Sequence, residues 1–302
     1  MGATEDVSQW HTLAPCLYDY FVSHHLAWPS LTCRWSPTPS SQSPLDPLRR
    51  VLLSERTGSA ARDRIIAVDL PVPPPRSCAA STWALRPPPP GLALPDPPVL
   101  SLAHPGEVTK LRELPSHPHL AVTHSDSPQL YLWDVYGGGS GEGVQPLAVL
   151  GGHADKAEYA LACSQIHPLV ASGGRDAAVL LWDVEVAAGR AAVRGEASPA
   201  PKTSLLTGSQ APALPKGRLP HPSSPTQRLA AHTATVEGLA FCPRTRSLLA
   251  SVGDDARLCL WDLRSGTRPV QALERAHGRG EDVHCVDWNA LDPFLLASGA
   301  AD

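Results

Sequence analysis

Three times along the chain, a histidine, a hydroxyl-bearing residue and an aspartate recur in the same order, the side-chain types of a hydrolytic Ser-His-Asp site. Each set is followed by a Trp-Asp dipeptide, and 29 residues separate histidine from tryptophan in every copy. An enzyme needs only one such site, so the repetition favours a structural role, a hydrogen-bonded chain within each repeat. The three sets are His104, Thr123, Asp126 and Trp133; His153, Ser172, Asp176 and Trp182; and His232, Ser251, Asp255 and Trp261.

Short strand candidates lie between these markers. "VEGLAFCP" alternates in polarity and ends at proline, "LLASVGDD" runs into a tight turn, and "RLCLWDL" begins the next strand. Several strands per ~40 residues are typical of a propeller blade, and the Trp-Asp ending resembles WD repeats. We therefore expect an all-β WD-repeat propeller with an N-terminal α-helix, seven blades when complete and about four to five here. A fourth copy opens at His277 and stops at Asp302, which predicts a carboxyl-truncated fragment.

Composition excludes several classes of function. A net charge of -4 and a pI near 6.3 argue against direct nucleic-acid binding. The seven cysteines form no C-x-x-C or zinc spacing, and no apolar run approaches the ~18 residues of a membrane span. No phosphate loop, metal-ligand spacing or lone nucleophile with its base is visible. We expect no enzyme, no cofactor and no membrane partner.

The chain divides at changes in composition. We expect the helix in residues 1–30, strands of a degenerate first blade in 31–70, and a linker in 71–98, where eleven prolines lie. Residues 99–302 should form the repeat blades. They contain an Ala-, Pro- and Ser-rich stretch at about 190–228, which we expect to be a surface insertion with no packing role.

Several motifs together resemble one family. These are "QWHTLAPCLYDYFVSHHLAWPSLTCRW", "HPGEVTKLRELP", "THSDSP", "GGHADKAEYALA", "SVGDDARLCLWD" and "AHGRGEDVHCVDWN". They are similar to the retinoblastoma-binding p48-type histone-binding proteins, also known as the small chromatin-assembly-factor subunit or the multicopy-suppressor-of-IRA group, nearest to the plant FVE-type branch. The resemblance implies a nuclear scaffold that binds histones three and four within histone deacetylase, Polycomb or chromatin-assembly complexes.

The resemblance also implies two histone sites. In one, the N-terminal helix forms a wall of a groove for a histone helix, and Leu17, Tyr18 and Phe21 would supply that wall. In the other, a basic histone tail docks on the propeller top, where carboxylates accept charge-assisted hydrogen bonds and a tyrosine face adds a cation–π contact. The matching rim residues, expected at equivalent positions of successive blades, are Glu107, Glu158, Tyr159, Glu237 and His284.

Two other functions stay open. Trp261, Asp262 and Arg264 fit the WDxR signature of substrate receptors on cullin-type ubiquitin ligases, in which the arginine contacts the ligase adaptor. A third possibility is a generic WD scaffold such as a ribosome-assembly factor, although the acidic tract usual near the amino end of such proteins is not visible here.

Overall fold

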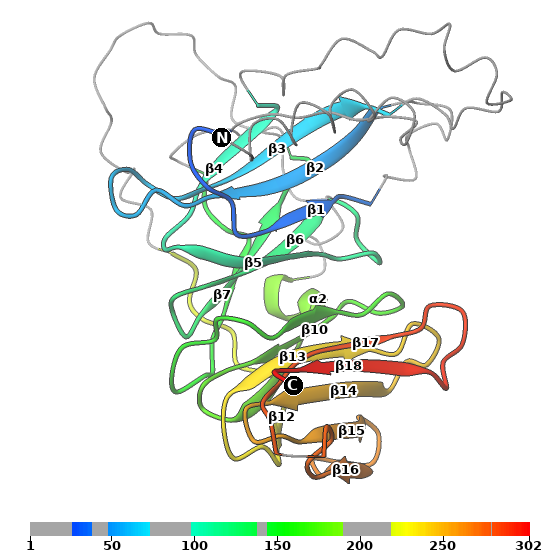
Figure 1. Ribbon diagram of the computed structural model, residues 1–302. Helices are drawn as coiled ribbons and strands as arrows, with labels where there is room; N and C mark the ends of the chain where they lie inside the picture. The colour runs from blue at the N-terminus through cyan, green and yellow to red at the C-terminus, as the bar shows by residue number, and fades with distance from the viewer. Residues whose placement is uncertain (1–25, 38–47, 73–97, 138–143, 190–218, 279) are drawn as a thin grey trace, which may run out of the picture.

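The computed structural model describes residues 26–37, 48–72, 98–137, 144–189, 219–278 and 280–302, and these residues are almost entirely β-sheet. Four antiparallel sheets have four strands each, and a fifth has two (Figure 1). We call the sheets blades A to E in chain order. In each complete blade the first strand lies at one edge and the last at the other, the arrangement of a propeller blade.

The strands of each blade follow one another in sequence. Blade A contains β1 (Cys33–Trp35), β2 (Leu48–Glu55), β3 (Arg64–Pro71) and β4 (Leu100–Ala103). Blade B contains β5 (Val108–Glu113), β6 (Leu120–Ser125), β7 (Leu130–Asp134) and β8 (Ala148–Leu150). Blade C contains β9 (Leu161–Cys163), β10 (Leu169–Gly173), β11 (Ala178–Asp183) and β12 (Gln227–Ala230), with the short helix α2 (Val184–Ala188) after β11. Blade D contains β13 (Val236–Phe241), β14 (Leu248–Gly253), β15 (Leu258–Asp262) and β16 (Gln271–Leu273). Blade E contains β17 (Val283–Trp288) and β18 (Leu296–Ala300).

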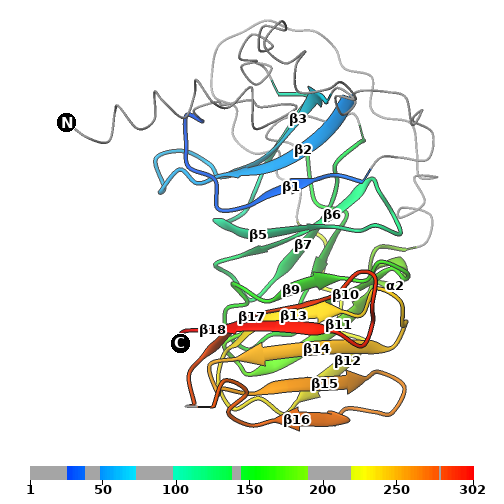
Figure 2. The same cartoon turned by 45° about the vertical axis from the view of Figure 1, so that its right-hand side comes forward.

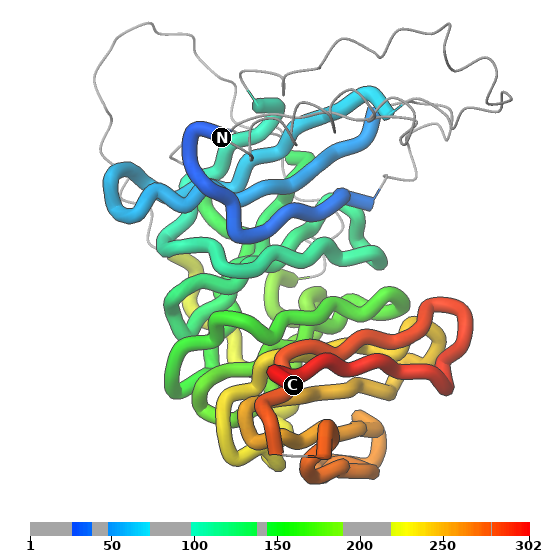
Figure 3. Tube along the Cα trace, viewed as in Figure 1, coloured from blue at the N-terminus to red at the C-terminus, as the bar shows by residue number. Residues whose placement is uncertain are grey.

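The first strands of the five blades are the inner strands. β1 contacts β5, β5 contacts β9, β9 contacts β13, and β13 contacts β17, so these strands follow one another along the molecule (Figure 2). The chain passes through the blades in sequence order, as the colour of the trace shows (Figure 3). The inner strands therefore line a shared central channel, and the predicted all-β propeller fold with four to five blades is confirmed.

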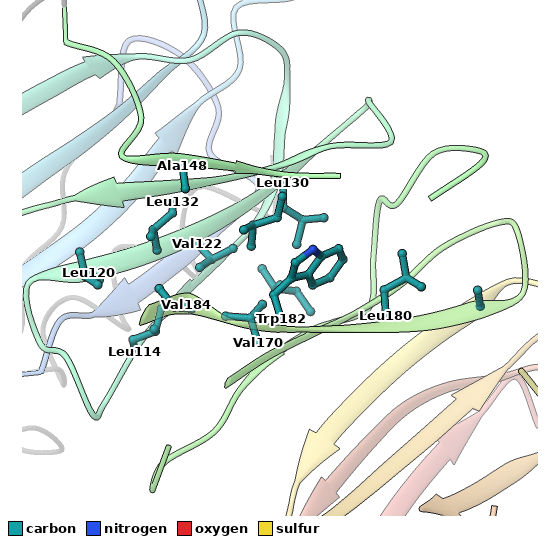
Figure 4. Packing of buried hydrophobic residues seen from close by; sticks show 13 residues of the cluster. Leu114, Leu120, Val122, Leu130, Leu132, Ala148, Val170, Leu180, Trp182 and Val184 are labelled. Atoms are coloured by element: carbon teal, nitrogen blue, oxygen red, sulfur yellow. The ribbon is translucent and has the colours of Figure 1, made fainter. Parts of the chain in front are cut away.

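The hydrophobic core consists of separate clusters between neighbouring blades. Trp133 lies between blades A and B, Trp182 between B and C, and Trp261 between C and D, each at most 1% exposed. Around Trp182, leucine and valine side chains of both blades converge on the indole (Figure 4). A buried indole removes roughly 150–250 Å² from water, so each repeat tryptophan attaches its blade to the preceding one.

The end of the long connection between β11 and β12 is packed, contrary to our expectation for residues up to 228. Ser223 pairs in parallel with Leu150 on the outer edge of blade B: its N–H donates to the Val149 carbonyl at 2.8 Å, and its carbonyl accepts from Gly151 at 3.0 Å. Because β12 then joins blade C, residues 219–226 tie blades B and C together. Polar composition suggested a loose loop, but the main chain of this segment is satisfied by a strand edge.

Two further expectations concern the first blade and membranes. The strand β4 follows the proline-rich linker and pairs with β3, so blade A is completed across that linker. The expected N-terminal helix lies outside the described residues. None of the helices within the described ranges is long and apolar enough to cross a bilayer.

Candidate functional site

The predicted hydrogen-bonded chain is complete in blade D. His232 Nδ1 lies 2.9 Å from an Asp255 carboxylate oxygen, and Nε2 lies 2.7 Å from Ser251 Oγ. The Trp261 indole N–H donates to the same hydroxyl at 2.8 Å. Nδ1 therefore carries the proton, and Nε2 accepts from Ser251. Since Ser251 and Trp261 are buried, the chain is structural and offers no exposed nucleophile.

Blade C departs from the predicted set at its tryptophan. His153 contacts Asp176 at 2.9 Å and Ser172 at 2.8 Å, as expected. The Ser172 hydroxyl, however, is shared with the buried His124 of blade B, whose Nε2 lies 2.9 Å away. The Trp182 N–H instead donates to the Ser223 carbonyl at 3.3 Å.

Blade B departs at its aspartate. His104 Nε2 and the Trp133 N–H both contact the Thr123 hydroxyl, at 2.9 and 3.0 Å. His104 Nδ1 donates to the Gly106 carbonyl at 2.7 Å rather than to Asp126. The turn before Trp133 has one extra residue, and it leaves Asp126 exposed, where it accepts from the Glu107 N–H.

Blade E contains the beginning of a fourth set. His277 Nε2 lies 3.0 Å from Ser298 Oγ, and its Nδ1 lies 3.3 Å from an Asp302 carboxylate oxygen. The histidines, with the turns that hold the aspartates, define one end of every blade, which we call the rim.

The register of the inner strands corrects the predicted equivalence of the rim residues. Thr123, Ser172, Ser251 and Ser298 face Leu111, Leu161, Leu239 and Val286, so these four inner-strand positions correspond. The equivalent rim positions, two residues earlier, are Thr109, Tyr159, Glu237 and His284. In blades B, D and E this residue is a β-bulge, where one residue is added to the inner strand. Glu107 and Glu158 stand outside this set.

Glu237 is the rim carboxylate best suited to a cation. It is half-buried, and no ion-pair partner of this side chain is found within the described part of the chain. Burial and the neighbouring Asp254 raise its pKa, while His284 and Lys110 oppose that shift. Tyr159 is 45% exposed, and the charge of Glu158 raises its pKa, together with burial. A bound cation would relieve the repulsion between Glu237 and Asp254.

The other two predicted carboxylates already have partners. Glu107 pairs with Arg56 of blade A at 2.6 Å. Glu158 is nearly buried between Lys156 at 3.4 Å and Arg175 at 3.6 Å. A basic ligand must displace these groups, so Glu107 and Glu158 are weaker candidates than Glu237. Asp254, which sequence reasoning missed, precedes the repeat aspartate in "GDD", and that doubled acid was the available signal.

Below the rim, cations that sequence reasoning also missed lie on the inner strands. Arg34 donates to Glu113 through two guanidinium nitrogens. Arg112 lies next to them, and burial together with the charge of Arg34 lowers its pKa. Lys110 lies nearer the rim on the same strand, and burial lowers its pKa to about 8. The run "VTKLRE" contained these residues but did not show which side they occupy.

The WDxR residues lie at the end opposite the rim. Arg264 is exposed, and Asp262 accepts from its guanidinium at 3.0 and 2.7 Å, which lowers the pKa of the carboxyl. Trp261 is buried in the core, so it positions this strand and offers no surface to a partner. Only Asp262 and Arg264 remain as possible contacts.

The predicted groove wall of Leu17, Tyr18 and Phe21 lies outside the described residues. The segment that follows it is attached to blade A: Pro29 accepts from the Arg56 N–H at 2.8 Å, and Leu31 donates to Ser54 Oγ at 3.3 Å. Among the residues with a described placement, no three His, Cys, Asp or Glu side chains form a group that could hold a metal ion.

Comparisons with known proteins agree with this geometry. A family model for the histone-binding protein RBBP4, or the third component of the CAF1 complex, matches residues 5–74, and the WD domain, G-beta repeat model matches 144–183 and 223–262. The chain is 36% identical to the Arabidopsis thaliana WD-40 repeat-containing protein MSI4 over 310 residues, covering 99% of this chain and 58% of that protein. It is 26% identical to Arabidopsis MSI3, covering 99% of this chain and 63% of that protein.

A crystal structure of RRP9 WD40 repeats matches with a TM-score of 0.43 and 18% identity, over 61% of this chain and 43% of that one. The chain spans about three fifths of the length of the MSI relatives it matches. The motifs quoted above, the blades and the sequence matches together show that the chain belongs to the WD-repeat family of RBBP4 and the MSI proteins, in its plant FVE-type branch.

Proposed function

We propose that the chain is a non-enzymatic histone-binding scaffold that takes a basic histone tail, such as that of histone three, on its rim. The observation that supports this best is the unpaired, half-buried Glu237 beside Asp254, with the exposed ring of Tyr159 on the neighbouring blade. A cation in this position gains a charge-assisted hydrogen bond and a π face together. The family model's description as histone-binding supports the same partner.

The assay is fluorescence anisotropy with an unmodified histone-three tail peptide. A hydrogen bond to a charged group contributes about 1.5–3 kcal/mol, so Glu237→Gln should weaken binding by roughly 10- to 150-fold. Glu107→Gln should cost less, because Glu107 must first release Arg56. Glu274→Gln is the matched control, since Glu274 is an exposed carboxylate paired with Arg257 on the outer part of blade D. Equal binding by the Glu237 and Glu274 variants would remove the rim site.

The wider role follows from the same family. We propose a nuclear protein of histone deacetylase, Polycomb or chromatin-assembly complexes, with a second histone site for histone four that includes Leu17, Tyr18 and Phe21. Affinity purification of the chain from nuclei, followed by mass spectrometry, tests which of these complexes contains it. Recovery of ribosome-assembly factors in place of chromatin proteins would favour the generic scaffold.

A second candidate function is adaptor binding in a cullin-type ubiquitin ligase. It is favoured by the exposed Arg264, which Asp262 holds in a fixed orientation at the end opposite the rim. Arg264→Ala should abolish capture by the ligase adaptor, and Arg268→Ala, another exposed arginine of the same turn region, should not. Neither variant should alter binding of the histone-three tail. Loss of tail binding in Arg264→Ala would mean that Arg264 has a structural role.

A further inference from the structure

Lys110 occupies a position at which several blades converge. Its ammonium group interacts with Arg34 on β1, Glu237 on β13 and Cys285 on β17, besides Arg112 on its own strand β5. These groups belong to four blades, and the inner strands are the elements that all four have in common near this point. The Lys110 side chain therefore lies in the central channel, directly beneath the rim residue Glu237.

Lys110 has no hydrogen-bond acceptor or ion-pair partner within the described ranges, although it is largely enclosed. The nearby acids do not compensate for it fully: Glu113 is held by Arg34 through two hydrogen bonds, and Glu237 faces the rim. Arg112 donates one N–H to the Leu111 carbonyl and adds a further positive charge. An enclosed cation without a partner is costly, and an anion supplied by a ligand would offset that cost.

We propose that the channel below the acidic rim is a subsite for an anionic group of the bound peptide, a carboxylate or a phosphate, with Lys110 as its partner. This subsite rests on the proposed rim function and deepens it. The rim takes a basic side chain at Glu237, and Lys110 takes an acidic or phosphorylated neighbour in the same peptide. The ligand class is thus a peptide in which positive and negative side chains alternate, rather than one that is uniformly basic.

The test uses the whole chain and three synthetic peptides that differ at one position between an arginine and a lysine: threonine, glutamate or phosphothreonine. The glutamate and phosphothreonine peptides should bind wild type on the order of tenfold more tightly than the threonine peptide. Lys110→Met should abolish that preference, Lys110→Arg should retain it, and Arg268→Met, far from the channel, should leave it unchanged. Inorganic phosphate, added as a competitor, separates recognition of the free ion from recognition within a peptide.

The pH dependence gives a second readout. Lys110 loses its charge as the pH rises through about 8, so the preference for the anionic peptides should decline above that pH in wild type but not in Lys110→Arg. The charged groups that face Lys110 and enter this comparison are Arg34, Arg112, Glu237 and Cys285.

The outcomes separate the subsite from the rim site. If the threonine peptide binds as tightly as the anionic peptides, or if Lys110→Met keeps the preference while remaining folded by circular dichroism, the subsite is wrong and the rim site stands. If no peptide depends on Glu237, the rim function itself fails. If phosphate alone displaces no peptide but the phosphothreonine preference is present, the subsite recognises the anion only as part of the peptide, which supports the proposal.

Discussion

Replacing Ser251 by alanine tests whether the repeated histidine, serine and tryptophan side chains hold the blades together. The Ser251 hydroxyl is completely buried and makes two hydrogen bonds, to His232 Nε2 at 2.7 Å and from the Trp261 N–H at 2.8 Å. Alanine leaves a donor and an acceptor without partners in a site closed to water. A buried polar group left unpaired costs about 1–3 kcal/mol, so the two together should cost roughly 2–5 kcal/mol.

The measurement must resolve single blades, because repeat proteins can unfold in parts. Amide hydrogen exchange of β14 and β15, read by mass spectrometry, reports the local opening free energy of blade D. Exchange there should accelerate by a factor of about 30 or more, while exchange in blade A should change little, because distant sites act independently. Ser265→Ala is the control, since Ser265 is exposed and donates one hydrogen bond to the Asp262 carbonyl.

The reasoning would be refuted if Ser251→Ala cost no more than Ser265→Ala. Such a result would mean that Trp261 and His232 find other partners without strain, and that packing alone fixes the blade.

Three further predictions concern the other blades and the pH. Trp182→Phe removes the indole donor to the Ser223 carbonyl, so proteolysis of the segment around Ser223 should become faster; an unchanged digestion pattern would contradict this role. Burial lowers the pKa of His104 to about 4, below its unfolded value of 6.5, so the unfolded state takes up a proton first and stability should fall by roughly 3 kcal/mol as the pH drops from 6.5 to 4. Urea midpoints across that range should fall less in His104→Asn, and equal slopes would exclude His104 as the cause. Gly253→Ala would push a methyl group against the Thr235 carbonyl oxygen, so the melting temperature should drop by several degrees, an overpacking cost of about 1–3 kcal/mol; an unchanged value would mean that this backbone yields easily.

The blades could be predicted from sequence because their signal is local and repeated. The 29-residue interval from histidine to tryptophan and the short strands between them are enough to locate Trp133, Trp182 and Trp261 in equivalent places. The complete set in blade D follows from the same spacing.

What the sequence did not reveal depends on contacts between blades or on strand register. Ser172 pairs with His124, 48 residues earlier, and this long-range contact is coupled to the diversion of Trp182 to Ser223. No spacing rule relates those positions. Glu107 and Glu237 both follow a repeat histidine closely, yet only Glu237 lies at the bulge. A one-residue difference in register decides which side chain faces the ligand.

The bulge residues Thr109, Tyr159, Glu237 and His284 have a consequence for evolution. Each comes from a different blade, and the blade's stability is carried by the inner-strand residue two positions further on, which packs into the core. A mutation at one of these four positions can therefore change a single contact without unfolding its blade or altering the other three. Duplicated copies of such a gene could diversify in specificity by single substitutions, with the scaffold left intact.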